Sequence, residues 1–201
     1  MAVKIPIILA SASPRRRDLL ARYNLPFIVD PSRYEEEEPA LKPEDMVLYL
    51  AHRKADEVAS RRSGLIIAAD TVVSLDDQIM GKPKDAEAAA IMLHALSGRC
   101  HQVFTGIVLL NTATGRSLEA VEKTSVWFRS LPENEMMMYI QSGEYVDKAG
   151  SYAAQGMAAT FISRIEGCYH NVIGLPLSRL DSLLNEFGIS LIQGTLEETE
   201  R

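Results

Sequence analysis

The sequence predicts an α/β fold, and three features carry that prediction. Apolar runs at 5–10 and 26–30 flank a helix start, which is typical of a strand–helix–strand beginning. Runs of strand composition at 101–110 and 117–129 are joined by a turn at 111–115, which indicates an antiparallel pair. Helical patterns between these runs supply the layers that cover a sheet.

The composition limits what the protein binds. The chain has 201 residues, of which 47% are apolar and 24% charged, enough for a substantial core in one domain or two lobes. Its net charge of -6 and sequence pI of about 5.3 argue against a general binder of nucleic acid or of anionic membranes. Any polyanion must meet a local cationic patch, so a small anionic ligand fits this chain better than DNA.

The chain shows no targeting or disulfide signature. The apolar run after Lys4 is too short for a signal peptide, and no apolar run approaches the roughly 18 residues that span a bilayer. The two cysteines, Cys100 and Cys168, form no CxxC motif and no Cys/His cluster, so neither a disulfide framework nor a zinc site is indicated. We expect a cytoplasmic protein with two ordinary thiols and no membrane partner.

The first strand leads directly into a helix start that suits an anion. Ser13 is a good N-cap and Pro14 a good first helical residue. A capping box would place Glu or Gln three residues after the cap, but Arg16 stands there, so positive charge gathers at the positive end of the helix dipole. Free N–H groups, the dipole, Arg15 and Arg16 would all face one anion, and a phosphate chain fits best. The alternative is an ordinary solvated helix face, which we prefer for Arg17.

The second strand leads into four consecutive glutamates at 35–38, closed by Pro39. Such a run is usually a solvated loop, and we expect this of three of the four. One glutamate placed beside bound phosphates would serve as a ligand for a hard divalent cation, because such cations select carboxylate oxygens.

A helix over 43–62 and a strand over 65–73 follow, and each carries one charged residue of interest. Lys54 lies at the edge of the helix's apolar stripe, where it either covers core surface or contacts a ligand. Asp70 interrupts a strand that reads as buried on both faces. An unpaired charge there is expensive, so Asp70 needs a metal, a cation or a set of hydrogen bonds. We take it as a functional candidate, with a structural carboxylate held by backbone donors as the alternative.

The second half of the chain alternates further elements with two polar loops. Lys82 stands on a stiff Gly-Lys-Pro loop, and 147–156 is a glycine-bounded loop with several polar side chains. Ser130 and Glu133 fit a capping box for a helix through Gln141. The other predicted elements are a turn, a helix, a strand and a final helix, at 76–78, 86–96, 159–165 and 176–187.

Seven short segments form a set in this order along the chain. They are SASPRR at 11–16, a glutamate pair near 36, AADTVV at 68–73, GKP at 81–83, SGRCHQVFTG at 97–106, DKAGSYAAQG at 147–156 and NVIGLPL at 171–177. Together they resemble the Maf family of nucleoside triphosphate pyrophosphatases over nearly the whole chain. One such motif would be a weak signal, whereas seven in sequence are a strong one.

The resemblance implies an α/β structure with a long twisted mixed β-sheet flanked by helices, forming two lobes around a cleft. This is similar to the fold of the inosine triphosphate pyrophosphatases. We expect a single Maf-like domain over 1–190 and a frayed C-terminal tail over 191–201. The resemblance favours a homodimer.

The resemblance further implies hydrolysis of a nucleoside triphosphate between its α- and β-phosphates, giving the monophosphate and pyrophosphate, with Mg²⁺ or Mn²⁺ as cofactor. It implies that Glu36 and Asp70 hold the metal, and that Asp70 is also the general base for the attacking water. Each carboxylate could do either job, because metal ligation and water activation need similar placement. The phosphates would be clamped by cationic and hydrogen-bonding side chains, which are Ser11, Arg15, Arg16, Lys54 and Lys82.

Within the family, the loop at 147–156 and Thr71 are similar to the branch that acts on dTTP and UTP, which implies that Thr71 and Gln155 lie near the base. The preference among dTTP, UTP and modified pyrimidines such as 5-methyl-UTP stays open. Two alternatives also stay open: a non-catalytic regulator of septum formation in cell division, and a pyrophosphatase for purines such as ITP or 7-methyl-GTP. Nucleic-acid binding through the arginines at 15–17 is disfavoured, because the chain is acidic and no aromatic platform lies nearby.

Overall fold

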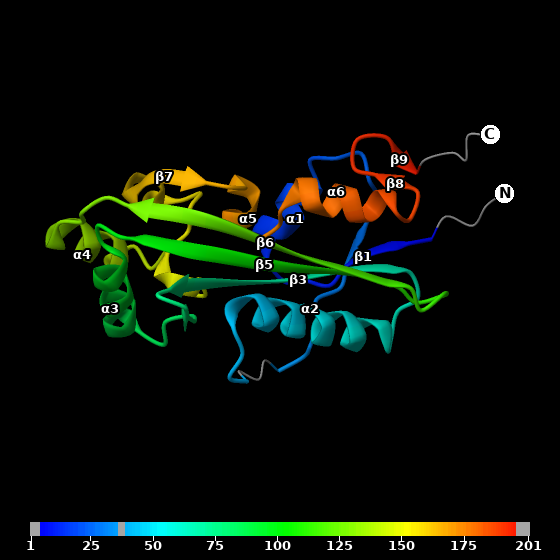
Figure 1. Cartoon of the computed structure of the whole chain (residues 1–201), viewed down its shortest axis with the longest axis horizontal. Coiled ribbons are helices and arrows are strands. Elements are labelled where there is room, and N and C mark those ends of the chain that lie inside the picture. Colours follow the sequence, from blue (N-terminus) through cyan, green and yellow to red (C-terminus); the bar gives the residue numbers. More distant parts are fainter. Residues whose placement is uncertain (1–4, 36–38, 196–201) are drawn as a thin grey trace.

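The computed structural model describes residues 5–35 and 39–195. Its strands are β1 (Ile7–Leu9), β2 (Ile28–Val29), β3 (Leu65–Leu75), β4 (Gln78–Met80), β5 (Cys100–Asn111), β6 (Ser117–Phe128), β7 (Ile162–Glu166), β8 (Ile189–Ser190) and β9 (Gly194–Thr195). Its α-helices are α1 (Pro14–Leu20), α2 (Pro43–Ala59), α3 (Ala86–Leu96), α4 (Glu133–Gln141), α5 (Tyr169–Ile173) and α6 (Leu177–Asn185), and two short 3₁₀ helices are η1 (Ala149–Ser151) and η2 (Met157–Phe161). Strands β1 to β7 form one sheet with helices on both faces (Figure 1).

The sheet changes strand direction at β3. Strand β1 runs parallel to both β2 and β3, as the strand–helix–strand start of the chain requires. On the other side of β3, strands β5, β6 and β7 follow in antiparallel order, and β5 and β6 form a long hairpin. The order is therefore β2-β1-β3-β5-β6-β7, with β4 paired to β3. The predicted α/β fold with a mixed sheet is confirmed, and so is the predicted antiparallel pair.

Strand β3 is buried on both of its faces, as its apolar run predicts. Successive side chains of a strand point to opposite faces. Leu65, Ile67 and Ala69 pack in one core with residues of α1 and α6, whereas Ile66 and Ala68 pack in another with residues of α2. Helix α2 accordingly lies along one face of the sheet, with α1 and α6 on the other (Figure 1).

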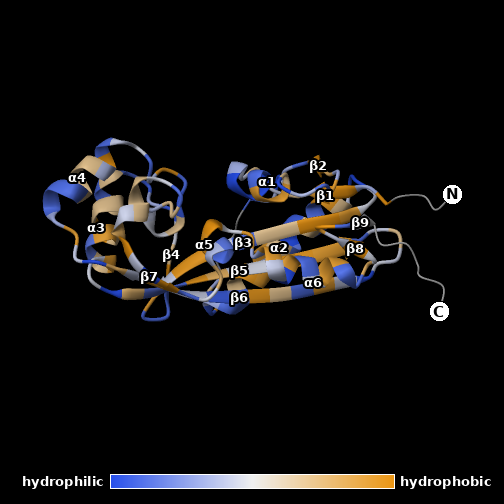
Figure 2. Cartoon of the chain, turned by 90° about the horizontal axis from the view of Figure 1, so that it is seen from above, coloured by the Kyte–Doolittle hydropathy of each residue, from blue (hydrophilic) through white to orange (hydrophobic). Residues whose placement is uncertain are grey.

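A second lobe packs around the end of β3, the start of β5 and the end of β6. Helices α3 and α4 lie there, apart from α1, α2 and α6 at the other end of the sheet (Figure 2). Aromatic rings from separate segments join the core of this lobe in edge-to-face contacts. The rings are those of Phe128, Tyr139, Tyr152 and Phe161.

The predicted capping box at the start of α4 is wrong. Helix α4 begins at Glu133 with Pro132 at its N-cap position, and no side chain caps it. Leu131, which would be the first helical residue after a Ser130 cap, instead donates its backbone N–H to Ser97 Oγ at 2.8 Å. This contact with the end of α3 delays the helix until after the proline.

The strand expected over 159–165 begins late. Residues up to Phe161 lie in η2, and β7 starts at Ile162. Thr160 Oγ1 donates to the Met157 carbonyl oxygen at 2.9 Å, and such a local side-chain bond offers the backbone an alternative to the strand.

The fold continues beyond residue 190, where the sequence places the end of the domain. Strands β8 and β9 pair with each other, and Leu191 between them is buried against the core that contains α6. The Leu191 N–H also donates to Asp181 Oδ1 at 2.7 Å. Leu191 and the β8–β9 pair thus continue the fold past residue 190, and residues 196–201 lie outside the described residues.

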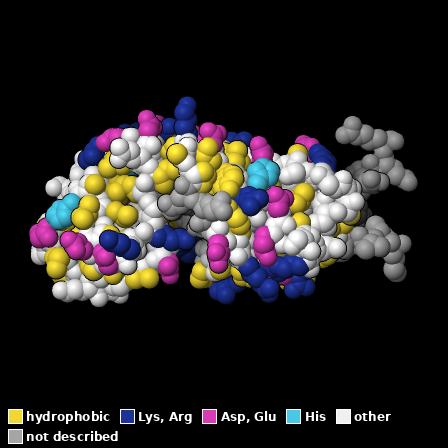
Figure 3. Space-filling view, turned by 90° about the horizontal axis from the view of Figure 1, so that it is seen from below, with side chains coloured by type: hydrophobic (Ala, Val, Ile, Leu, Met, Phe, Trp, Pro, Cys, Tyr) yellow, Lys and Arg dark blue, Asp and Glu magenta, His cyan; other side chains and the backbone are white. Residues whose placement is uncertain are grey.

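The surface carries charges of both signs. In the view of Figure 3, acidic and basic side chains stand close to one another with hydrophobic side chains between them. At the lower edge of this face several Lys and Arg side chains lie side by side, with acidic side chains next to them (Figure 3). None of the helices in the described ranges is long and apolar enough to cross a membrane.

Candidate active site

The site is built at an open stretch of the β3 edge. Strand β1 pairs with β3 only as far as Ile67, and β4 pairs with it only from Val73 onward. The backbone between them therefore faces a cleft of about 540 Å³, which includes Asp70 and Thr71 in its lining. In open α/β sheets, ligands bind in crevices at the carboxyl ends of strands, and this cleft lies at the carboxyl end of β1.

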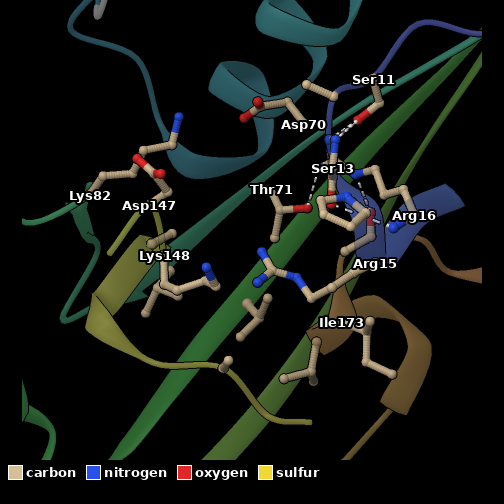
Figure 4. A pocket seen from close by; sticks show the side chains of 18 of the residues that line it. Ser11, Ser13, Arg15, Arg16, Asp70, Thr71, Lys82, Asp147, Lys148 and Ile173 are labelled. Carbon is tan, nitrogen blue, oxygen red and sulfur yellow. Dashed lines mark hydrogen bonds between the residues drawn. The ribbon is translucent and has the colours of Figure 1, made fainter. Parts of the chain in front are cut away.

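Helix α1 starts directly at this crevice. Ser13 is its N-cap and accepts the Arg16 N–H at 3.4 Å, with Pro14 in the first turn, as the sequence predicts. Ser11 Oγ in turn accepts the Ser13 N–H at 3.2 Å. The helix N-terminus and its arginines thus face the cleft (Figure 4). Arg17, by contrast, is exposed and pairs with Asp18, so its predicted surface role is confirmed.

Arg16 joins three separate segments of the chain. Its Nε donates to the Gly174 carbonyl oxygen at 2.7 Å, its Nη1 to Ser11 Oγ at 3.2 Å and its Nη2 to Thr71 Oγ1 at 2.9 Å. The Thr71 hydroxyl is also within 2.9 Å of the buried Thr105 hydroxyl. Arg16 therefore holds α1, β3 and the end of α5 in one arrangement around the cleft.

Arg15 is placed differently from its neighbour. Its guanidinium is half-buried and, within residues 5–35 and 39–195, makes no side-chain hydrogen bond or ion pair. Burial lowers the pKa of Arg15, and the nearby Tyr139 hydroxyl opposes that shift. An arginine stays charged in proteins, so Arg15 presents a positive charge to the cleft.

Asp70 is paired with a cation from α2. By the alternation along β3, its side chain lies on the same face as Ala68, which is the face that α2 covers. Lys54 Nζ donates to Asp70 Oδ1 at 2.5 Å, and the two side chains are 12% and 10% exposed. The buried carboxylate therefore has the partner that its burial requires, and the lysine does more than cover core surface.

A glycine on β5 allows this pairing. Gly106 stands opposite Asp70 in the β3–β5 register. A Cβ atom on Gly106 would lie 2.6 Å from the Val47 carbonyl oxygen of α2. The missing side chain lets α2 approach the sheet closely, which brings Lys54 within reach of the β3 carboxylate.

The loop at 147–156 forms the opposite wall. Gly150, which has φ +63°, donates its N–H to the Gly81 carbonyl oxygen at 3.1 Å, so this loop is tied to the one that carries Lys82. The two loops bring Lys82, Asp147, Lys148 and Gln155 to the cleft lining.

Behind this wall lies a buried histidine. His101 is fully buried, and its Nε2 is 2.8 Å from the Tyr152 hydroxyl. Burial lowers the pKa of His101 to about 4, so the ring is neutral near pH 7. Its ring packs edge to face against Phe128 and Tyr152, which indicates a structural role beneath the cleft.

The structure brings the predicted site residues together, with one exception. Glu36 lies outside the described residues, so its predicted role as a metal ligand stays a prediction. The others line one cleft, and they are Ser11, Arg15, Arg16, Lys54, Asp70, Thr71, Lys82 and Gln155.

Three further residues belong to the site by geometry and are not among the predicted site residues. Asp147 and Lys148 line the cleft, and Gly106 sets the approach of α2. The glycine-bounded loop was the signal for the first two, since both residues begin it. Gly106 ends the segment SGRCHQVFTG, but nothing near it in the sequence indicates its role, because its neighbour Val47 comes from a distant helix.

The described part of the cleft carries few side chains that could bind a metal ion. Among the described residues, no three His, Cys, Asp or Glu side chains gather at one point. A protein-only cage is thus not formed by this part of the chain. The Asp70 carboxylate at the cleft fits a cation such as Mg²⁺, which takes one or two carboxylates and completes its shell with phosphate oxygens and water.

Sequence comparisons find close relatives over most of the chain. The profile of a family described as Maf-like protein matches residues 6–187. A dTTP/UTP pyrophosphatase of Pelotomaculum thermopropionicum is 48% identical over 92% of this chain and 98% of its own length. The dTTP/UTP pyrophosphatase of Ruminiclostridium cellulolyticum is 47% identical over 93% of this chain and 98% of its own length.

Comparison with solved structures addresses the fold alone. A Ham1 protein from Staphylococcus aureus superposes with a TM-score of 0.52 at 15% identity, covering 90% of this chain and 99% of that one. A HAM1 protein from Coxiella burnetii gives a TM-score of 0.50 at 17% identity with the same coverage. The mixed sheet with its flanking helices is thus an architecture shared with these proteins.

Proposed function

Because the chain belongs to the Maf family, we propose that it is a pyrophosphatase that hydrolyses dTTP and UTP to the nucleoside monophosphate and pyrophosphate. Four relatives that carry this name match at 44–48% identity, each over at least 98% of its own length. Their names give the substrate class, and the cleft of this chain supplies groups suited to it.

The observation that carries the proposal is a cationic cleft with a buried carboxylate in an acidic protein. The chain has a net charge of -6. The described part of the cleft lining nevertheless combines a majority of cations with two carboxylates, and the charged side chains are Arg15, Arg16, Lys54, Lys82, Lys148, Asp70 and Asp147. Such a balance suits a polyphosphate, whose charge these cations would hold.

In the proposed reaction, Asp70 is the general base. A water molecule beside its carboxylate gives up a proton to Asp70 while its oxygen attacks the α-phosphorus. The bond from that phosphorus to the oxygen that bridges to the β-phosphate breaks, and pyrophosphate leaves. Lys54, bonded to Asp70 Oδ1 at 2.5 Å, holds the carboxylate in its orientation.

The cations of the cleft would stabilise the negative charge that develops on the phosphate oxygens during the reaction. Arg15 and Lys82 would bind non-bridging phosphate oxygens, and Ser11 would donate a hydrogen bond beside the start of α1. Arg16 would act mainly by holding these walls together, since its guanidinium already bonds Ser11, Thr71 and Gly174.

A divalent cation would be held by Asp70 together with substrate phosphates, with Glu36 as the second protein ligand predicted from the sequence. Bound there, Mg²⁺ or Mn²⁺ would neutralise phosphate charge and polarise the attacked phosphorus.

The base would lie toward Thr71 and Gln155. Gln155 is exposed at the rim of the cleft and carries both a donor and an acceptor, which can pair with the edge of a pyrimidine. Small residues at 153–154 precede it and leave room for the ring. A homodimer and a cytoplasmic location stay predictions.

A nucleotide panel tests the proposal. Purified protein with Mg²⁺ or Mn²⁺ is given dTTP, UTP, 5-methyl-UTP, CTP, ITP and 7-methyl-GTP at equal concentration, and products are separated by ion-exchange chromatography. We expect dTMP or UMP with pyrophosphate. Release of a diphosphate with orthophosphate, or a tenfold preference for ITP over dTTP, would overturn the assignment, and no turnover of any nucleotide would favour a non-catalytic role.

A further inference from the structure

Two cations face each other across the cleft. Arg15 lies in the first turn of α1, and Lys148 lies at the start of η1 on the opposite wall. Figure 4 shows the guanidinium of Arg15 and the ammonium of Lys148 pointing toward one another. Both residues line the cleft.

Neither charge is neutralised by an ion pair among the described residues. The Lys148 ammonium donates one hydrogen bond, to the Val146 carbonyl oxygen at 2.8 Å, and an ammonium has three donors. The pKa of Lys148 is lowered mainly by burial and secondly by the Arg15 charge. The charges of Asp147 and Glu144 oppose this shift. Two like charges held this way are costly unless an anion lies between them.

The backbone that carries each cation is anchored to the rest of the fold. Arg15 follows the capped start of α1. Lys148 comes two residues before Gly150, which is bonded to the Gly81 carbonyl oxygen at 3.1 Å. A Cβ atom on Gly150 would also lie 2.9 Å from Val73 Cγ1, so this loop is seated tightly on β3.

We propose that Lys148 is a substrate-binding residue, and that it and Arg15 hold one phosphate group of the triphosphate between them. The inference rests on the proposed function and extends it, because it assigns a phosphate contact to the loop that also carries Gln155. A phosphate so held connects α1 with the opposite wall of the cleft. Lys148 would recognise the phosphate group by its charge. It therefore contributes to affinity for the polyphosphate and does not select the base.

The test uses the full chain with Lys148→Gln, Lys148→Arg and, as matched control, Lys84→Gln. Lys84 is an exposed lysine of the same region that does not line the cleft. Calorimetry with inorganic tripolyphosphate and Mg²⁺ measures binding without turnover, and steady-state kinetics with dTTP and UTP measure KM and kcat. Thermal melting of each variant confirms that it folds.

We expect Lys148→Gln to weaken tripolyphosphate binding about tenfold and to raise KM for both nucleotides by a similar factor, with the ratio between dTTP and UTP unchanged. Lys148→Arg should recover most of the affinity, and Lys84→Gln should match the wild type. Unchanged tripolyphosphate affinity in Lys148→Gln would overturn the inference and leave the proposed function standing. A wild type that binds tripolyphosphate through Lys148 but hydrolyses no nucleotide would overturn the proposed function instead.

Discussion

Lys54 on α2 donates a hydrogen bond of 2.5 Å to Asp70 on β3, and both side chains are almost buried at the edge of the cleft. The two residues are 16 positions apart, on a helix and on the strand that it covers. Removing one partner of a buried pair leaves the other as an uncompensated charge. The pair therefore links the packing of α2 to the chemistry proposed for Asp70.

Asp70→Asn should lower kcat by about 10²- to 10⁴-fold, because an amide cannot accept the proton of the attacking water. Pyrophosphate release from dTTP measures the effect. Asp76→Asn is the matched control, since Asp76 lies exposed in the β3–β4 turn at φ +51°, a conformation that asparagine tolerates. Equal turnover in Asp70→Asn and the wild type would exclude Asp70 as the base.

Gly106→Ala should reduce both stability and activity. Its Cβ would lie 2.6 Å from the Val47 carbonyl oxygen, so α2 must shift and carry Lys54 away from Asp70. We expect the free energy of unfolding to fall by about 1–3 kcal/mol and kcat to fall with it. Gly115→Ala, in a turn with open space around it and φ +70°, should cost about 1 kcal/mol of backbone strain without changing kcat. Wild-type kcat in folded Gly106→Ala would show that the close approach does not position the pair.

Arg16→Lys keeps the charge but loses the planar fork that joins Ser11, Thr71 and Gly174. The free energy of unfolding should fall by about 2 kcal/mol, and kcat/KM for dTTP should fall at least tenfold. The same substitution at the exposed neighbour, Arg17→Lys, should change stability by no more than about 0.5 kcal/mol. Urea denaturation of both variants gives the comparison, and similar losses in the two would contradict the bridging role of Arg16.

Stability should fall as the pH is lowered from 6.5 toward 4 because of His101. Burial lowers the pKa of its ring to about 4 from 6.5, so in this range the unfolded chain binds a proton that the folded chain does not. The loss from this group is complete below about pH 4 and amounts to about 3 kcal/mol. His101→Gln, which can still bond the Tyr152 hydroxyl, should flatten this part of the profile, whereas exposed His94→Gln should not. Chemical denaturation of the wild type and both variants at several pH values measures these profiles.

Removal of divalent cations should abolish turnover of dTTP and UTP. The described carboxylates at the cleft are too few for a protein-only cage, so the cation should bind together with the phosphates and exchange readily. Dialysis against EDTA followed by titration of Mg²⁺ or Mn²⁺ measures this. Full activity after dialysis would show that the cleft cations suffice for the reaction.

Local physics made several features predictable from the sequence. Ser13 and Pro14 define the start of α1 through a cap and a fixed φ, which need no distant partner. The apolar run of β3 marks a strand buried on both faces, and the carboxylate within it had to have a partner. The motifs at 11–16, 68–73 and 147–156 indicated the family and hence the fold.

Only the tertiary structure decided which residues meet. Arg16 and Gly174 are 158 positions apart, and their hydrogen bond depends on how α5 returns to the sheet. The role of Gly106 depends on its contact with a backbone atom of α2. Arg15 and Lys148 point toward one another only because the fold places α1 and the loop at 147–156 on opposite sides of the cleft. Capping and strand burial follow from neighbours within a few residues, whereas contacts across the cleft follow from the packing of whole elements. That packing is set by many weak interactions at once, which no single segment of the sequence encodes.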